Sequence, residues 1–93
     1  MIGSALETGY EMSRIINEPV TVHLDKDSVI RAFIWRRRLY QVLTILSSWR
    51  ESSRWWNDEA MRFLTRVVAT NNATGIYELC EIGGKWFLHS VLD

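Results

Sequence analysis

The sequence predicts an all-β fold: a small antiparallel six-stranded meander, closed into an SH3-like or OB-like partly open barrel. Apolar and polar residues alternate over short runs, as they do in half-buried strands. The runs follow one another closely and are separated by Asn, Asp and Gly, which favour tight turns. The chain has 93 residues, 47% of them hydrophobic, which is enough for one small domain with a single core.

Residues 1–18 carry the weakest signal. Their apolar residues could line a short helical face that Gly9 interrupts. These residues are Ala5, Leu6, Met12, Ile15 and Ile16. We therefore expect a loosely ordered or short helical N-terminal arm over 1–18, followed by a single small β-barrel domain over 19–93.

The first two strands are expected over 20–24 and 29–35. Pro19 suits the start of a strand, where the ladder requires no amide. Apolar and polar residues alternate over 20–24, and 29–35 is dense in β-branched and aromatic residues. The Asp- and Ser-rich segment 25–28 predicts the turn between them.

The third strand is expected over 39–49, after a short connection at 36–38. Apolar side chains of 39–49 fall on both faces, which predicts a strand that bends from one sheet into another, as in small barrels. Residues 50–60 are polar except for Trp55 and Trp56, and we interpret them as an ordered loop.

Three further strands are expected over 61–70, 76–82 and 85–92. Residues 71–75 contain Asn and Gly, which tolerate positive φ and predict a turn. Gly83-Gly84 between two apolar runs predicts a two-residue hairpin.

Charge is unevenly distributed along a chain whose formal net charge is zero. Residues 31–66 hold eight arginines against three carboxylates, whereas both flanking segments are acidic. A neutral total argues against strong coating of DNA, because such affinity comes from many phosphate contacts. A local basic patch in the middle of the chain remains compatible with these numbers.

Arginine and tryptophan occur side by side in this basic middle. Arginine offers charge and a flat face, and tryptophan a broad π surface, so the pair suits phosphate contact and base stacking, or a partner with carboxylates and aromatic rings. Trp35 and Trp86 lie in predicted strands and are expected at the core or its edge, and Trp49 is left undecided. The candidate site for nucleic acid or a partner comprises Arg36, Arg37, Arg38, Arg50, Arg54, Trp55 and Trp56. A structural use competes with this one, since Glu51 and Glu78 can pair with arginines such as Arg62 or Arg66.

The order and spacing of these motifs resemble a small bacterial Trp/Arg-rich domain of unknown function. That domain occurs alone or at the C-terminus of Y-family polymerase-like (translesion synthesis) proteins. The matching pieces are Pro19-Val20 before its acidic turn, Phe33-Ile34-Trp35-Arg36, Arg38-Leu39-Tyr40-Gln41-Val42, Trp49-Arg50, Arg54-Trp55-Trp56, Arg62, Tyr77-Glu78-Leu79 and Trp86-Phe87-Leu88-His89 through Asp93. The resemblance implies a DNA-damage-tolerance context and supplies no catalytic residues. Arg37 stands where the pattern has a turn glycine, and arginine resists positive φ.

No constellation for catalysis is present, so we expect no enzyme. Adjacent strand residues point to opposite faces, so His89 and Ser90 cannot act as a pair, and Cys80 lies among apolar strand residues. His23 and His89 lack metal-ligand spacing, and we expect no metal and no cofactor. One cysteine and no membrane-spanning run or signal peptide favour a cytoplasmic protein without membrane contact.

Two hypotheses of function follow. The first is a non-catalytic, nucleic-acid-associated module that contacts phosphates through its arginines and stacks Trp55 or Trp56 on a base of single-stranded or duplex nucleic acid. The second is a protein-interaction or homo-oligomerisation module of a polymerase accessory complex. In it an exposed sheet edge pairs with a polymerase-like protein or a second copy.

Overall fold

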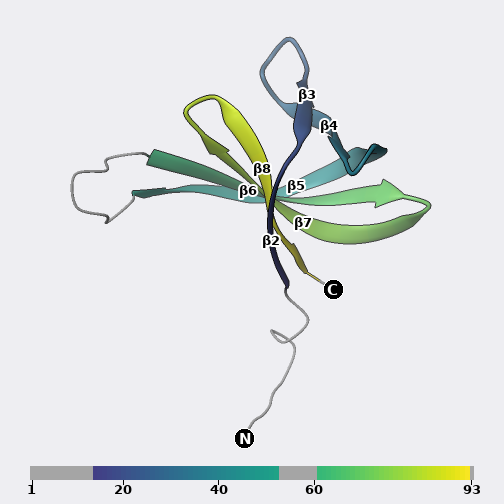
Figure 1. The fold of residues 1–93 in the computed structure, drawn as a ribbon. Helices are drawn as coiled ribbons and strands as arrows, with labels where there is room; N and C mark the ends of the chain where they lie inside the picture. The colour runs from purple at the N-terminus through teal and green to yellow at the C-terminus, as the bar shows by residue number, and fades with distance from the viewer. Residues whose placement is uncertain (1–13, 53–60, 93) are drawn as a thin grey trace, which may run out of the picture.

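The computed structural model describes residues 14–52 and 61–92, which form one antiparallel sheet and no helix (Figure 1). The all-β prediction is therefore confirmed over this range. The sheet has seven strands, in the order β2-β8-β7-β6-β5-β4-β3. Their bounds are β2 Arg14–Pro19, β3 Thr21–Leu24, β4 Ile30–Trp35, β5 Arg38–Ser52, β6 Met61–Asn71, β7 Ala73–Ile82 and β8 Lys85–Leu92.

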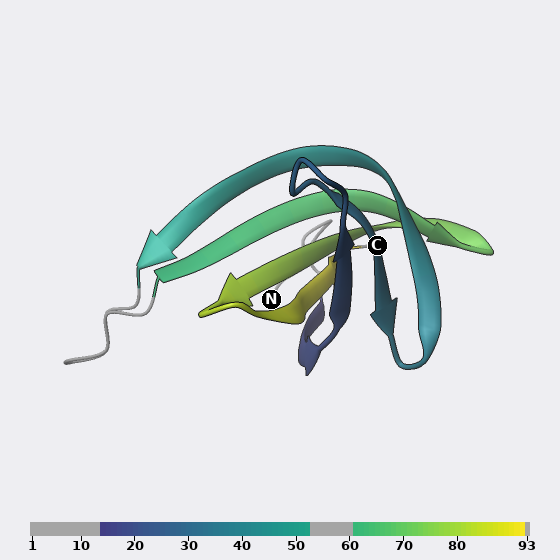
Figure 2. The same cartoon turned by 90° about the horizontal axis from the view of Figure 1, so that it is seen from above.

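The sheet curls into a half-barrel because its two edge strands are consecutive in the chain (Figure 2). Only Val20 separates β2, which pairs with β8, from β3, which pairs with β4. The Val20 amide donates a 3.1 Å hydrogen bond to the Trp86 carbonyl, just where the chain passes from one edge of the sheet to the other. The first described segment thus joins both ends of the meander.

All six predicted strands are present, and β2 is an additional one. The expectation of a loose or helical arm is wrong for Arg14–Glu18, which pairs with β8. Residues Ile15 and Ile16 fit a helical face as well as a strand, and only the pairing of this segment with the distant β8 decides between the two. Residues 1–13 of the expected arm lie outside the described residues.

Strand β5 continues to Ser52, so the expected loop over 50–60 is wrong for 50–52, which pair with β6, and 53–60 lie outside the described residues. The strand bends, as predicted, but it stays within the one sheet. Two irregularities in its pairing with β6, between Val42 and Thr44 and between Ile45 and Ser47, leave Leu43 and Leu46 as extra residues. Such bulges bend a strand and increase its twist. Apolar side chains on both faces therefore come from bulges and an open edge, and the expected second sheet is absent from the described residues.

The core lies inside the curl and is closed at one end by aromatic rings. Phe33 and Tyr40 stack with ring centroids 5.0 Å apart, and Tyr77 meets Phe33 edge-on at 5.6 Å. Trp35 and Trp86 pack against this core, which confirms their expected place at its edge. The buried cluster comprises Ile30, Phe33, Val67, Ala69, Tyr77, Leu79, Leu88 and Val91.

The turn between β4 and β5 is shorter than expected. Trp35 pairs with Arg38, so Arg38 belongs to β5 and only Arg36 and Arg37 form the turn. Both have positive φ, 53° and 66°, as a two-residue hairpin of the type I′ class requires. The expected hairpin at Gly83-Gly84 is confirmed, and the predicted turn over 71–75 contracts to Asn72 between β6 and β7.

Candidate functional site

Four side chains form a row across the concave face at the open end of the half-barrel. Arg50 of β5 is in register with Phe63 of β6, Phe63 with Glu81 of β7, and Glu81 with Trp86 of β8. Directly paired residues of an antiparallel sheet share a face, so the row presents a cation, two aromatic rings and an anion side by side.

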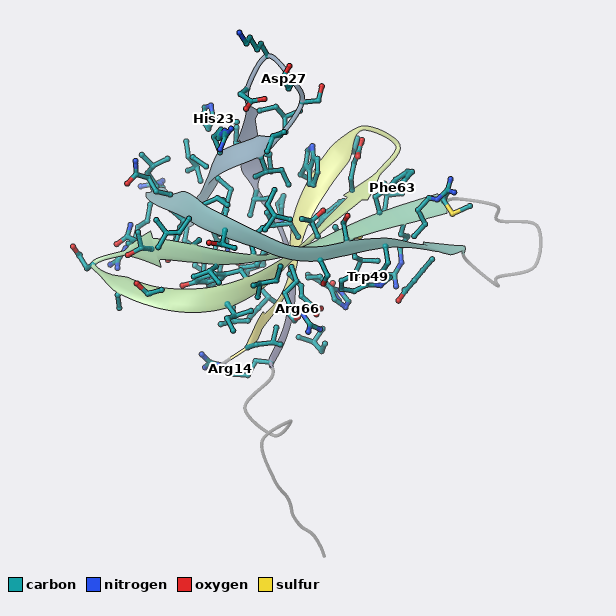
Figure 3. The ribbon with its side chains drawn as sticks, turned by 180° about the vertical axis from the view of Figure 1, so that it is seen from behind. Arg14, His23, Asp27, Trp49, Phe63 and Arg66 are labelled. Carbon is teal, nitrogen blue, oxygen red and sulfur yellow. The ribbon has the colours of Figure 1, made fainter. Side chains whose placement is uncertain are left out.

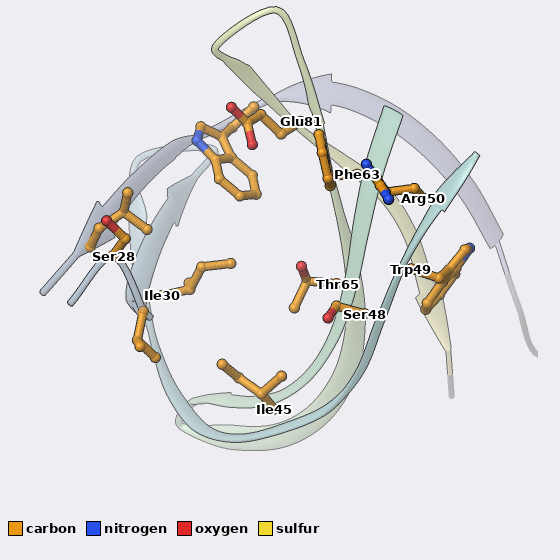
Figure 4. Close-up of a pocket in the computed structure, with 12 residues that line it drawn as sticks. Ser28, Ile30, Ile45, Ser48, Trp49, Arg50, Phe63, Thr65 and Glu81 are labelled. Atoms are coloured by element: carbon orange, nitrogen blue, oxygen red, sulfur yellow. The ribbon is translucent and has the colours of Figure 1, made fainter. Parts of the chain in front are cut away.

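This row is part of a cavity of about 720 Å³, which we call the mouth cavity (Figure 4). Its opposite wall is the β3–β4 hairpin, through Leu24, Ser28, Val29 and Ile30. Ile45, Ser48 and Thr65 line it from β5 and β6. Volumes of this size are typical of sites that enclose a small molecule or several side chains of a partner.

The mouth cavity is apolar at its base and polar on one wall. Behind the row lie Thr65 and Leu79, and behind them Val67 and Tyr77, so polarity decreases toward the closed end. Three large apolar side chains of the lining stay open to solvent: Leu24 (47%), Ile45 (41%) and Phe63 (44%). Exposed apolar groups that converge on a concavity indicate a binding surface.

Arg50 and Glu81 provide the charges of the mouth cavity. The Arg50 guanidinium lies 5.7 Å from the centre of the Phe63 ring. Within residues 14–52 and 61–92, neither Arg50 nor Glu81 takes part in an ion pair. A ligand that enters the cavity can therefore meet a carboxylate-binding cation and a carboxylate on the two sides of Phe63, along the same wall.

The convex face carries a second row in which the arginines are already paired. Figure 3 shows Trp49 and Arg66 on the opposite side of the sheet from Phe63. Arg66 donates a 2.9 Å hydrogen bond to the buried Glu78, which also accepts one of 3.0 Å from Ser90. The expected pairing of Glu78 with Arg66 is confirmed.

Arg62 and Glu51 form the second ion pair of the convex face. This pairing lowers the pKa of the Glu51 carboxyl, and a hydrogen bond from the Trp49 indole acts in the same direction. Trp49, left undecided by the sequence, is a half-buried part of this network. Its ring also lies 5.6 Å from the Arg66 guanidinium, and Trp49 adjoins the lining of the mouth cavity at its rim (Figure 4).

Arg36 is likewise committed within the fold. Its Nε and one terminal nitrogen donate to the two oxygens of Glu18 at 2.9 and 2.7 Å, and its guanidinium lies 4.6 Å from the Trp35 ring centre. Trp35 Nε1 donates to the same carboxylate at 2.8 Å. These donors lower the pKa of Glu18 from 4.5 to about 2, with the Arg36 hydrogen bond as the largest cause.

The structure separates the two halves of the site predicted from the sequence. Arg36, Arg37 and Arg38 lie at one end of β5, and Arg50 lies near the other. At roughly 3.3 Å per residue, the strand extends about 40 Å from Arg38 to Arg50. Figure 2 shows the two ends of this strand far apart. All four of these arginines are exposed. Arg54, Trp55 and Trp56 lie outside the described residues.

Sequence reasoning found Arg50 but missed the partners that make it part of a site. Phe63, Glu81 and Trp86 reach the cavity only through cross-strand pairing with β5, β6 and β7. The sequence did contain one signal for the site, because Phe63 is a large apolar residue beside the polar segment that precedes its strand. Its partner across the sheet depends on register, which the sequence leaves open.

The histidines and the cysteine do not gather around a possible metal. His89 Nδ1 lies 3.1 Å from the Asn17 amide oxygen, and His23 is exposed on β3. Across the described part of the chain, no group of three or more His, Cys, Asp or Glu side chains could hold a metal ion. Cys80 is buried on β7, and burial raises the pKa of its thiol.

A single curled antiparallel sheet with a cavity at its open end defines a small all-β domain. Residues 11–93 match the model of a family described as a domain of unknown function, DUF6504, and the chain belongs to this family. The match includes every described strand. No curated protein and no solved structure matches the chain. The described residues contain no helix long and apolar enough to cross a membrane.

Proposed function

We propose that this domain is a non-catalytic module that binds a protein partner by enclosing apolar side chains in the mouth cavity. The observation that carries the proposal is the convergence of Leu24, Ile45 and Phe63, all solvent-exposed, on a cavity that also offers Arg50. Burial of such groups contributes about 25 cal/mol per Å² removed from water, and a cation at the rim adds orientation.

The distribution of arginine favours a protein partner over nucleic acid. Arg31, Arg36, Arg62 and Arg66 each pair with a carboxylate. Arg37 and Arg38 lie at the end of β5 remote from Arg50. Binding to nucleic acid needs many phosphate contacts on one continuous surface, and the described arginines do not supply such a surface.

The identity of the partner follows from the resemblance of the motif string. Association of the similar domain with Y-family polymerase-like proteins suggests a protein of translesion synthesis as the partner. A cytoplasmic location belongs to the same proposal.

Selection of a displayed random-peptide library on the purified domain tests the proposed function. Binding of the selected peptides is then compared between two variants with adjacent substitutions. Ser48→Trp fills the mouth cavity, whereas Ser47→Trp places the same ring on the convex face. We expect Ser48→Trp to reduce affinity at least tenfold and Ser47→Trp to leave it nearly unchanged.

Two results would contradict the proposal. One is the absence of peptides that distinguish the two variants. The other is micromolar binding of a single-stranded oligonucleotide that weakens steeply with salt and is lost in Ser48→Trp, which would favour the nucleic-acid hypothesis. Thermal unfolding of both variants shows that the comparison is made on folded protein.

A further inference from the structure

We infer that the partner binds as an additional strand along the unpaired edge of β5, with a carboxylate beside Arg50 and an apolar side chain in the mouth cavity. This inference rests on the proposed function and specifies the form and chemistry of its ligand. It adds that the backbone of β5 forms hydrogen bonds with the partner, which the proposed function does not require.

Among the described strands, most of β5 has a neighbour on one side only. Its pairing with β4 runs from Arg38 to Gln41, while its pairing with β6 continues to Ser52. Beyond Gln41, no described strand borders the other edge of β5, which forms the outer margin of the curl in Figure 2. Every residue over 43–48 is exposed, whichever face its side chain occupies. Such an edge presents free amides and carbonyls that can pair with another chain.

The edge divides into an irregular half and a regular half. The bulges at Leu43 and Leu46 disturb the first half, and bulges discourage edge-to-edge pairing. From Ser47 to Ser52 the pairing with β6 proceeds without interruption. The regular half is therefore the part able to accept an added strand.

An added strand would extend over the opening of the mouth cavity. Ser48 and Arg50 of the regular half line the cavity, as do Leu24 and Ile30 across from them. Because side chains alternate along a strand, two residues of the partner separated by one would both face the cavity. The partner residue opposite Ser48 meets the apolar lining, and the one opposite Arg50 meets its guanidinium.

Charge complementarity selects a partner with an acidic residue over a second copy of this chain. Glu51 is committed to Arg62 on the convex face, whereas Arg50 has no carboxylate partner among the described residues. If two copies paired along the regular half with their concave faces aligned, the described side chains that could lie opposite Arg50 are those of Ser48 and Arg50 itself. Neither supplies a carboxylate. A partner strand with an acidic and an apolar residue two positions apart can place the first beside Arg50 and the second against the apolar lining next to Ser48.

A blocked peptide of sequence Thr-Asp-Tyr-Leu-Thr-Ile tests the inference. Its Asp and Leu would oppose Arg50 and Ser48, and its Tyr would oppose Trp49. When the peptide binds, we expect new hydrogen-exchange protection of those amides over 47–52 that face the free edge, measured by NMR on the whole chain. Methylation of the peptide nitrogens that would face β5 should abolish binding, because it removes the hydrogen-bond donors to the free edge of the sheet. Arg50→Glu should weaken binding about tenfold, and an Asp-to-Lys peptide should restore it. Arg37→Glu is the matched control, an equal change of charge at the far end of β5.

The outcomes separate this inference from the proposed function. Equal binding of the methylated peptide, without protection over 47–52, would overturn strand addition and leave the cavity as the site. Absence of binding by this peptide, together with failure of the library selection, would overturn both. A concentration-dependent dimer that protects the same amides without peptide would show that a second copy occupies the edge.

Discussion

Glu18 receives both ends of the Arg36 guanidinium fork, and so ties β2 to the turn between β4 and β5. These segments are not neighbours in the sheet order. The contact therefore bridges the curl, and the carboxylate helps to hold the half-barrel closed at the end remote from the mouth cavity.

The ion pair between Glu18 and Arg36 predicts that the stability of the fold depends on pH. The pKa of the Glu18 carboxyl is about 2 in the folded protein and 4.5 ordinarily, so the unfolded chain binds the proton more readily. The stabilisation by the ionised carboxylate is complete above about pH 4.5 and is lost as the pH falls toward about 2. Glu18→Gln should therefore lower the melting temperature at pH 6 and lose most of this effect at pH 2. Arg36→Gln should reproduce most of the result, because the Trp35 indole still donates to Glu18, and the double variant should be no less stable than Glu18→Gln alone. Additive effects would show that the two side chains act separately.

The two ion pairs of the convex face should differ in their contribution to stability. Arg66→Ala leaves the buried Glu78 carboxylate with Ser90 as its remaining partner, at a cost of about 1–3 kcal/mol. Arg62→Ala exposes an already half-exposed Glu51 and should cost less than about 1 kcal/mol. Urea unfolding of both variants measures the difference. Equal losses would show that burial of Glu78 does not matter.

The turn at Arg36 and Arg37 should gain stability from glycine. Arg37 has φ of 66°, a conformation that costs a residue with a side chain about 1 kcal/mol relative to glycine. Arg37→Gly should therefore be more stable than Arg37→Ala by about 0.5–1 kcal/mol, after the greater entropy of unfolded glycine is included. The alanine variant controls for loss of charge. If alanine proves the more stable of the two, the strain is not in this turn.

A buried leucine and an exposed leucine should differ in how much their replacement by alanine destabilises the protein. Leu79 is fully buried in the core, so Leu79→Ala should destabilise the protein by about 2–5 kcal/mol. Leu43 is an extra residue of a bulge and 57% exposed, so Leu43→Ala should change stability by less than about 0.5 kcal/mol. Calorimetric unfolding gives both values. A large loss in Leu43→Ala would mean that its side chain is covered in solution.

Strands were predictable wherever alternation and turn residues agreed locally. The Gly83-Gly84 hairpin and the alternation over 20–24 are determined by neighbours in the chain. Strand β2 was not predictable, since Ile15 and Ile16 suit a helix equally well until the residues around Ile16 pair with β8. The candidate site shows the same limit. Arg50 stood out by composition, whereas its neighbours Phe63 and Glu81 are assembled by register across three strands.

The junction at Val20 has a consequence for how the chain folds. Strands β4 to β8 can form from successive hairpins, each of short sequence separation, but β2 must pair with β8 near the other end of the chain. Contacts between residues far apart in the sequence form slowly, because the entropy cost of closing the long loop comes before the contact contributes any favourable free energy. Strand β2, synthesised before the other described strands, would thus be among the last to dock, and a nascent chain would expose its apolar concave face until synthesis reached β8.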